Sequence, residues 1–266
     1  MGVNTKALKN RIRSVDSTLH LTSAMGLVAA SKMRRASEAM HNGRQYAAAY
    51  GRVMNVLTAS PECRRSPYMR QEGNRTRLIV IAGDRGLAGG YNANVFRLTE
   101  SLQADHIHPI GKRACDRYNG EFQSSEHFTG AHAAALARSL CEDFINGAFD
   151  RLGIVYTSYI SMMTQEASVK WLLPLEKTEK AESLGAIFEP DEETILNATV
   201  PDYIAGIIMA CIRESFACEV AARRMAMDSA GKNARSMIED LQLQYNRARQ
   251  GAITQEITEI VAGAEQ

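Results

Sequence analysis

The segment of this 266-residue sequence best placed to do chemistry is glycine-rich and runs Asp84-Arg85-Gly86-Leu87-Ala88-Gly89-Gly90-Tyr91-Asn92. It follows an apolar run at 77–82 that suits a buried strand, and a helix is expected from Asn92 to Leu102. A glycine-rich turn between a strand and a helix is typical of anion-binding sites. The spacing here fits neither a dinucleotide fingerprint nor a phosphate loop, and Asp84 puts a carboxylate where a phosphate would sit. We therefore expect a tight turn that needs glycine's backbone freedom, with no bound cofactor.

Four histidines in the same region, His106, His108, His127 and His132, are the candidates for metal ligands. Alternation along a strand puts the first two on one face, but no Asp or Cys partner has a recognisable spacing. We expect solvated or locally hydrogen-bonded histidines and no metal. The five cysteines include no Cys-x-x-Cys pair, which argues against a disulfide framework and a structural zinc site. No nucleophile or acid–base constellation is recognisable, so we expect a chain that is not itself an enzyme.

Composition excludes further classes. A hydrophobic content of 45% and a charged content of 23% are those of an ordinary globular chain. We see no apolar run of the roughly 18 residues that span a bilayer and no signal peptide, so a cytoplasmic protein is expected. The net charge of +1 conceals a basic segment, residues 1–60, with nine Lys or Arg against Asp16 and Glu38. Such a segment favours acidic partners, but it lacks the interleaved aromatics that single-strand nucleic-acid binding would require.

The elements that position these residues are outlined by proline. All six prolines lie between 61 and 201, so residues 1–60 and 202–266 can form long helices, the second starting at Pro201-Asp202. Both segments carry apolar or small residues with a 3.5-residue period, which is typical of a left-handed coiled coil. The N-terminal seam is Leu8, Ile12, Val15, Leu19, Thr22, Gly26, Ala29, Met33, Ala36, Met40, Gly43, Ala47, Tyr50, Met54 and Leu57. The C-terminal seam is Val220, Arg224, Met227, Gly231, Ala234, Ile238, Leu241, Tyr245, Ala248 and Ala252.

Two long helices at opposite ends of a chain can pair antiparallel only if the middle is inserted between them. We predict an α/β fold: an antiparallel coiled-coil shaft of 1–60 and 202–266 with an inserted Rossmann-like head at 75–190. Residues 61–74 and 191–201 are predicted to connect the two, the acidic run at 189–193 being a solvated linker. The alternatives on pattern alone are a coiled-coil spacer or a closed helical bundle. Within the head we expect strands at 77–82, 106–110, 151–160 and 169–175, and helices at 92–102, after 111–113, and at 131–146.

Three motifs resemble the gamma subunit of F-type ATP synthases: residues 21–36 (LTSAMGLVAASKMRRA), the loop Asp84–Asn92, and the closing stretch 245–264 (YNRARQGAITQEITEIVAGA). Together with Leu172-Leu173-Pro174-Leu175, they extend the resemblance from end to end. It implies a noncatalytic rotor subunit whose helices form a shaft inside a hexamer of alpha and beta subunits. The head would contact the epsilon subunit and the c-ring, and rotation driven by proton flow would be coupled to ATP synthesis or hydrolysis. The chain would lie peripherally at the cytoplasmic face of a bacterial membrane and bind no nucleic acid.

The resemblance also implies site residues. The shaft residues that it places against alpha and beta are Met25, Lys32, Arg34, Arg35, Arg223, Arg249, Gln250, Thr254, Glu256 and Glu259. The head-loop residues that it marks are Asp84, Arg85, Gly86, Gly89, Gly90 and Asn92.

The sequence departs from the family pattern at Ser23, Gly26, Ala88 and Gly231. Ser23 removes a positive charge beside Met25, and each of the two glycines would loosen a helix by about 1 kcal/mol relative to alanine. Two other classes remain as alternatives, a free-standing nucleotide-binding α/β protein and a coiled-coil adaptor.

Overall fold

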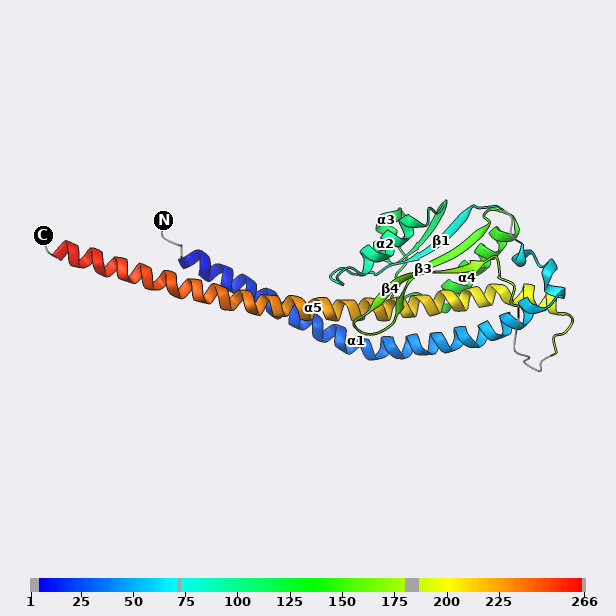
Figure 1. Ribbon diagram of the computed structural model, residues 1–266, viewed down its shortest axis with the longest axis horizontal. Coiled ribbons are helices and arrows are strands. Elements are labelled where there is room, and N and C mark those ends of the chain that lie inside the picture. Colours follow the sequence, from blue (N-terminus) through cyan, green and yellow to red (C-terminus); the bar gives the residue numbers. More distant parts are fainter. Residues whose placement is uncertain (1–4, 71–72, 180–186, 265–266) are drawn as a thin grey trace. The chain divides into compact units, whose positions relative to one another are not determined.

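The computed structural model describes residues 5–70, 73–179 and 187–264 (Figure 1). Packing divides the chain into two units, residues 1–29 with 223–266, and residues 30–222. The two long helices, α1 (Thr5–Ala59) and α5 (Glu192–Ala264), contribute to both units. The predicted fold class, an α/β head with long terminal helices, is confirmed, whereas the predicted domain limits stay a prediction.

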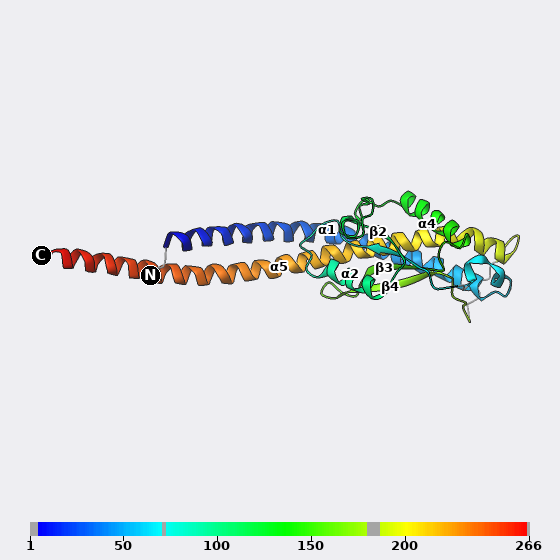
Figure 2. The ribbon, with the colours of Figure 1, turned by 90° about the horizontal axis from the view of Figure 1, so that it is seen from above.

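In the first unit, α1 and α5 pair antiparallel, and Figures 1 and 2 show the two helices side by side. A Cβ added at Gly26 would lie 3.7 Å from Met227 Cβ, and one at Gly231 would lie 3.8 Å from Leu19 and Thr22. Every predicted α1 seam position from Leu8 to Ala29 is buried or half-buried, whereas Leu27, off the seam, is 73% exposed. The predicted period is therefore confirmed for α1.

Two predicted seam positions of α5, Arg224 and Ala252, are wrong, because both are exposed. Arg224 carries a charged head that is costly to bury without a partner. Ala252 lies one turn beyond Ala248, which the contacts at Gly26 and Gly231 place opposite Thr5, the first described residue of α1.

The second unit contains a four-stranded sheet with the strand order β2-β1-β3-β4. The strands are β1 (Thr76–Ile81), β2 (His106–Ile110), β3 (Arg151–Tyr159) and β4 (Gln165–Leu173). β1 is parallel to both β2 and β3, and β3 and β4 form an antiparallel hairpin. All four predicted strands exist, although β4 begins at Gln165 and ends at Leu173, earlier at both ends than predicted.

Helices cover both faces of this sheet (Figure 1). Leu78, Val80 and Val155 on one face pack with Val95 of α2 (Tyr91–Ser101). Ile79, Ile81 and Ile154 on the other face join a larger core with α4 (Gly130–Ile145), α5 and the end of α1. The short helix α3 (Lys112–Tyr118) follows β2. Because a strand in such a sheet is buried on both faces, the continuous apolar run at 77–82 is explained.

The C-terminal helix begins at Glu192, so the predicted start at Asp202 and the predicted linker at 191–201 are wrong at the level of secondary structure. Asp191 caps the helix, because its carboxylate accepts hydrogen bonds from the Thr194 N–H and hydroxyl, each at 2.8 Å. Pro201 lies inside the helix and removes one backbone hydrogen bond. Complete burial of the Leu196, Val200 and Ile204 side chains at helical spacing offsets that cost.

One 18-residue window of α5 has a mean hydropathy of 1.6, enough by length and composition for a membrane span. The sequence-based expectation that no such stretch exists is therefore too strong. The helix owes this hydropathy to core residues such as Ile204, Ile207 and Ile208, which are buried against the sheet-containing unit. Those side chains already have apolar partners within the protein.

The two seam glycines should reduce stability, because each position has room for a methyl group. We predict that Gly26→Ala and Gly231→Ala each raise the free energy of unfolding by about 1 kcal/mol, because the added methyl meets only ordinary contacts. Urea unfolding followed by circular dichroism measures the change.

Gly43→Ala is the matched control. A Cβ there would lie 3.3 Å from the Ala210 Cα, a backbone atom that cannot yield easily, so this change should give no gain. A loss of stability at Gly26 or Gly231 would contradict the prediction.

Candidate functional site

The glycine-rich loop is organised around the Asp84 carboxylate. Oδ1 accepts hydrogen bonds from the backbone N–H groups of Lys112 and Ser125, both at 3.0 Å. Oδ2 accepts one from the Ser124 hydroxyl at 2.6 Å and one from the Glu126 N–H at 3.1 Å. The carboxylate thus takes the donors that an incoming phosphate would need, and the loop joins β1 to the start of α3 and to residues 124–126.

Electrostatics agree with that geometry. Burial alone would raise the pKa of the Asp84 carboxyl, but the hydrogen bonds from Ser124, Lys112, Glu126 and Ser125 together outweigh it and hold the pKa below its ordinary value. The group is therefore a carboxylate at neutral pH, which repels anions. The interpretation of this segment as a structural turn is the one that the geometry favours.

The remaining loop residues fasten the turn to its neighbours. The Asn92 side-chain oxygen accepts a hydrogen bond from the Gly83 N–H at 2.9 Å, and Gly89 has a φ of +57°, which favours glycine. The Tyr91 hydroxyl donates to the Ser215 carbonyl of α5 at 3.1 Å. A Cβ on Gly83 would come within 2.7 Å of the buried Glu219 carboxyl, so there is no room for a side chain at position 83.

Lys32 and the head loop meet at one acidic residue. The Lys32 ammonium pairs with Glu126 Oε1, and the Arg85 guanidinium lies 3.7 Å from Glu126 Oε2. The Glu126 backbone N–H is also a donor to Asp84. Two basic residues from distant parts of the sequence therefore share one carboxylate next to the glycine-rich loop.

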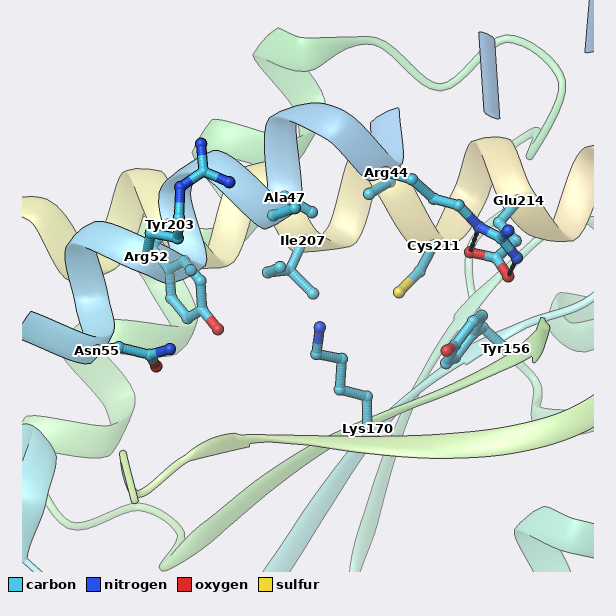
Figure 3. Close-up of a pocket in the computed structure, with 13 residues that line it drawn as sticks. Arg44, Ala47, Arg52, Asn55, Tyr156, Lys170, Tyr203, Ile207, Cys211 and Glu214 are labelled. Carbon is cyan, nitrogen blue, oxygen red and sulfur yellow. Dashed lines mark hydrogen bonds and ion pairs between the residues drawn. The ribbon is translucent and has the colours of Figure 1, made fainter. Parts of the chain in front are cut away.

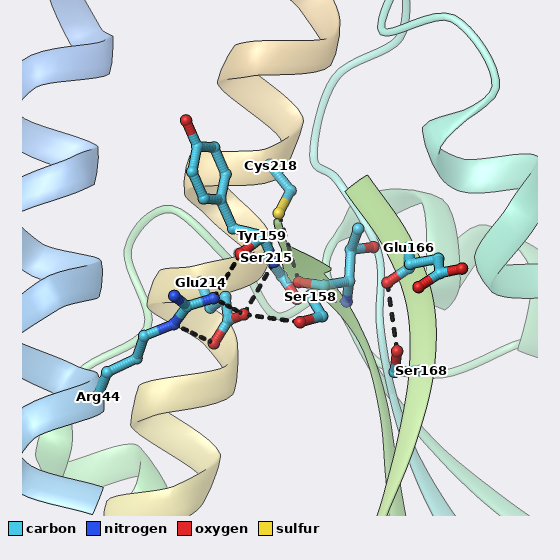
Figure 4. Close-up of polar contacts among 9 residues, drawn as sticks. Arg44, Ser158, Tyr159, Glu166, Ser168, Glu214, Ser215 and Cys218 are labelled. Atoms are coloured by element: carbon cyan, nitrogen blue, oxygen red, sulfur yellow. Dashed lines mark hydrogen bonds and ion pairs between the residues drawn. The ribbon is translucent and has the colours of Figure 1, made fainter. Parts of the chain in front are cut away.

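A second ion pair joins α1, α5 and the β3–β4 hairpin (Figure 4). Arg44 donates to both oxygens of Glu214, at 2.6 and 3.2 Å, and also to the Tyr159 carbonyl at 2.6 Å. Glu214 Oε1 accepts two more hydrogen bonds, from the Tyr159 N–H at 2.9 Å and from the Ser158 hydroxyl at 3.2 Å. Hydrogen bonding to Glu214 raises the pKa of Arg44 above its ordinary value, so the guanidinium stays charged. Because Glu214 is only 7% exposed, it depends on these donors.

The other predicted shaft residues are not gathered into one site. Arg34 pairs with Glu38 one turn away, with 3.2 Å between Nε and Oε1, and Arg35 is exposed. Met25 and Arg223 are half-buried, and Arg223 has a contact within the chain. The five predicted residues near the C-terminus are all exposed on α5: Arg249, Gln250, Thr254, Glu256 and Glu259. Their contacts are local, such as the hydrogen bond from Gln255 to Glu259 at 2.9 Å.

His106 and His127 are exposed, whereas His108 is half-buried and His132 caps a helix. The His132 side chain accepts a hydrogen bond from the Thr129 N–H and completes the cap of α4, while burial lowers the pKa of His108. In the three described ranges, no three His, Cys, Asp or Glu side chains are grouped as a metal site.

Sequence reasoning missed Glu126, Arg44, Glu214 and Glu219. Glu214 and Glu219 carried a usable signal, since each interrupts an apolar stretch of a helix, and a buried carboxylate needs a partner. Nothing in the spacing identifies Arg44 or Glu126, because their partners are 170 and 94 residues away.

Comparison with known proteins places this geometry in a family. The family model described as ATP synthase matches residues 4–266. A relative from Ruminococcus albus named ATP synthase gamma chain is 41% identical, over 97% of this chain and 96% of that protein. Another, from Acetobacterium woodii, is named ATP synthase gamma chain, sodium ion specific; it is 36% identical, over 100% and 99%.

The chain belongs to the ATP synthase gamma chain family. The resemblance that the three motifs predicted is confirmed over the whole length.

Solved structures of ATP synthases share the fold. A chain of the Euglena gracilis mitochondrial ATP synthase superposes with a TM-score of 0.66 at 16% identity, covering 98% of this chain and 93% of that one. A chain from the central stalk and c-ring structure of the Tetrahymena thermophila mitochondrial enzyme gives 0.61 at 21% identity, covering 79% and 99%.

The Arg44–Glu214 pair should matter for stability in this gamma-chain fold. We predict that Arg44→Ala lowers the free energy of unfolding by about 2 kcal/mol, because Glu214 then keeps a buried charge without its main partner. The value is below that of a fully buried pair because the Arg44 side chain is 44% exposed. Urea unfolding monitored by fluorescence of Trp171, the single tryptophan, measures it.

Arg34→Ala is its control. It breaks the exposed Arg34–Glu38 pair and should cost less than about 0.5 kcal/mol. Equal losses in the two variants would contradict the special role of Glu214.

The Asp84 carboxylate should make the fold sensitive to acid. Its folded-state pKa lies below the unfolded value of about 3.9, so its stabilisation is complete above that pH and is lost as the pH falls through the folded pKa. We predict that Asp84→Asn costs about 2 kcal/mol at pH 7 and progressively less below about pH 4. Urea unfolding at pH 7 and at a pH below about 4 measures the two costs.

The exposed Asp116→Asn serves as its control and should change stability by less than about 0.5 kcal/mol at either pH. A cost for Asp84→Asn that is the same at both pH values would contradict the ionic origin of its effect.

Proposed function

We propose that this chain is the noncatalytic central rotor subunit of an F-type ATP synthase. It couples rotation of a membrane ring, driven by ion flow, to ATP synthesis or hydrolysis at sites on alpha and beta subunits. Membership of the gamma chain family supports the proposal most directly. The similar Tetrahymena chain comes from a structure of a central stalk and c-ring, which supports the same position for this chain.

The paired helices of the first unit suit a shaft. Gly26, Ala29 and Gly231 keep the helix axes close, so the pair is slender. Beyond Ala248, α5 continues without a partner in the described part of α1 and exposes apolar side chains: Ile253, Ile257, Ile260 and Val261 are 46–66% exposed. Apolar residues at this spacing on an unpaired helix favour burial in another protein, and the cavity of an alpha–beta hexamer is the partner we propose.

The way this chain uses its polar groups supports a noncatalytic role. The carboxylate oxygens of Asp84, the best candidate for chemistry, accept hydrogen bonds from four donors within the chain. Glu214 likewise accepts from Arg44, Ser158 and Tyr159. The chemistry of ATP is therefore assigned to the alpha and beta subunits.

Contacts to those subunits are proposed for the shaft residues. The basic pair Arg34 and Arg35 and the C-terminal set Arg249, Gln250, Thr254, Glu256 and Glu259 are exposed on helices, as an exchangeable contact requires. Three predicted contact residues differ: the Lys32 ammonium already pairs with Glu126, and Met25 and Arg223 are half-buried. Contacts of the sheet-containing unit with an epsilon subunit and a c-ring, and a peripheral location at the cytoplasmic face of a bacterial membrane, complete the proposal.

Reconstitution tests the role against its two rivals. Mixed with alpha and beta subunits, the chain should assemble with three copies of each per copy of itself and should change their ATPase activity. Unchanged ATPase activity would overturn the proposal. Tight nucleotide binding by the isolated chain would favour the nucleotide-binding alternative, and unrelated proteins in a pull-down would favour an adaptor.

A rotating shaft needs unbroken helices, and Ser17 offers a test. It is exposed on α1, and its hydroxyl bonds only to the Arg13 carbonyl of the preceding turn. Ser17→Pro removes a backbone hydrogen bond at a cost of about 3 kcal/mol and kinks the helix. We predict that it strongly reduces ATP-driven rotation in the reconstituted complex, measured by single-molecule observation.

Ser17→Ala loses the same hydroxyl but keeps the helix, so it should rotate normally. Normal rotation of the proline variant would show that α1 carries no torque.

A further inference from the structure

A cleft of about 420 Å³ lies within the second unit, between α1, α5 and the β3–β4 hairpin. Its walls include Arg52, Tyr156, Lys170, Tyr203 and Cys211. Figure 3 shows the Lys170 side chain rising from β4 into this space, with its ammonium directed toward Ile207 and the two tyrosines on either side. Neither the glycine-rich loop nor any predicted shaft residue lines this cleft.

The cleft has an excess of positive charge. Its single acidic residue, Glu214, is neutralised by Arg44 and also accepts from Ser158 and Tyr159, so its oxygens are already used. Within the described parts of the chain, neither Lys170 nor Arg52 has a carboxylate within ion-pair distance. Figure 3 shows the Arg52 guanidinium directed away from Lys170, which leaves Lys170, an exposed residue, as the cation that points into the cleft.

The other walls supply hydrogen-bond donors and apolar surface. Burial raises the pKa of both Tyr156 and Tyr203, so each keeps its hydroxyl proton and can donate. Asn55 adds an amide, while Ala47, Ile207 and Ala210 are apolar. A volume of this size suits a compact organic molecule better than a bare ion, since ligand pockets typically span about 300–1,000 Å³.

We propose that this cleft binds a small organic anion, a phosphate monoester or a carboxylate with a compact apolar body, through the Lys170 ammonium. The tyrosine hydroxyls orient the anionic group, and the apolar body lies against the α1 and α5 walls. Because its occupant touches two helices and the hairpin, binding also raises the thermal stability of the chain. The inference does not depend on the proposed rotor function.

Calorimetric titration of the full chain without other subunits tests the site. The probes are phenyl phosphate and benzoate. Benzyl alcohol is the neutral analogue, and inorganic phosphate is the anion that lacks an apolar body. We expect at least one of the two organic anions to bind about tenfold or more tightly than both comparison probes. Whichever of the two binds more tightly identifies the anionic group. Equal binding of benzyl alcohol or of inorganic phosphate would overturn the proposal.

Variants assign the binding to this cleft. Lys170→Gln should weaken the organic anion about tenfold, because it removes the charge and keeps a side chain of similar length. Ala48→Leu, on the α1 wall, should weaken binding by filling the cleft without changing its charge. The matched control is Lys112→Gln, an exposed lysine on α3 outside the cleft, which should bind as the parent does.

Unfolding midpoints of all three variants separate lost binding from lost folding. Unchanged affinity in a folded Lys170→Gln protein, or an equal loss in Lys112→Gln, would overturn the assignment.

Discussion

The rest of the second unit depends on the packing of one face of α5 against the sheet. Leu196, Val200, Ile204 and Ile208 on that face have no exposed surface, and they belong to the same core as Ile79 and Ile154. Farther along α5, polar contacts join the helix to its neighbours. The Ser215 hydroxyl accepts a hydrogen bond from the Thr157 N–H at 3.1 Å, and the Ser215 carbonyl accepts one from the Tyr91 hydroxyl. Apolar burial supplies the stability, and these few polar bonds determine which part of β3 and of the glycine-rich loop meets which turn of the helix.

How much of this was predictable depends on the range of the interactions. Strands β1 to β4 and the α1 seam follow from local sequence patterns. A strand buried on both faces gives a continuous apolar run, and a helix buried on one face gives apolar residues at every third or fourth position. The start of α5 was not predictable in this way. Proline at 201 is a strong local signal for a helix start, and only the apolar side chains of Leu196 and Val200, buried by the tertiary fold, override it. The sequence around Glu214 signals that it needs a partner, but nothing local identifies Arg44, which is 170 residues away.

The glycine-rich loop shows why a motif must be judged by what surrounds it. A strand, a glycine-rich turn and a helix form an anion-binding arrangement in many proteins. In this chain the Asp84 carboxylate is itself the group that accepts the four hydrogen bonds. Because Gly83 has no side chain, there is room beside it for the Glu219 side chain. Gly83 therefore allows close approach between the start of the loop and α5, whereas Gly89 allows the positive φ of the turn. The position of Asp84 at the head of the motif was the informative feature, because a carboxylate and a phosphate compete for the same donors.

Polar groups in the described part of the chain fall into two sets. One set holds several hydrogen bonds or ion pairs within the chain, and the other is exposed on helices. Asp84, Glu126 and Glu214 each hold several donors and act as internal fasteners. Arg35, Arg249 and Glu256 lie on exposed helix surfaces, as the proposed exchangeable contacts with other subunits require, since exposed ion pairs are individually weak. Lys170 is exposed as well, but its side chain points into a cleft whose own carboxylate, Glu214, is already paired with Arg44. The proposed anion would give the Lys170 ammonium the partner that the described chain does not supply in that cleft.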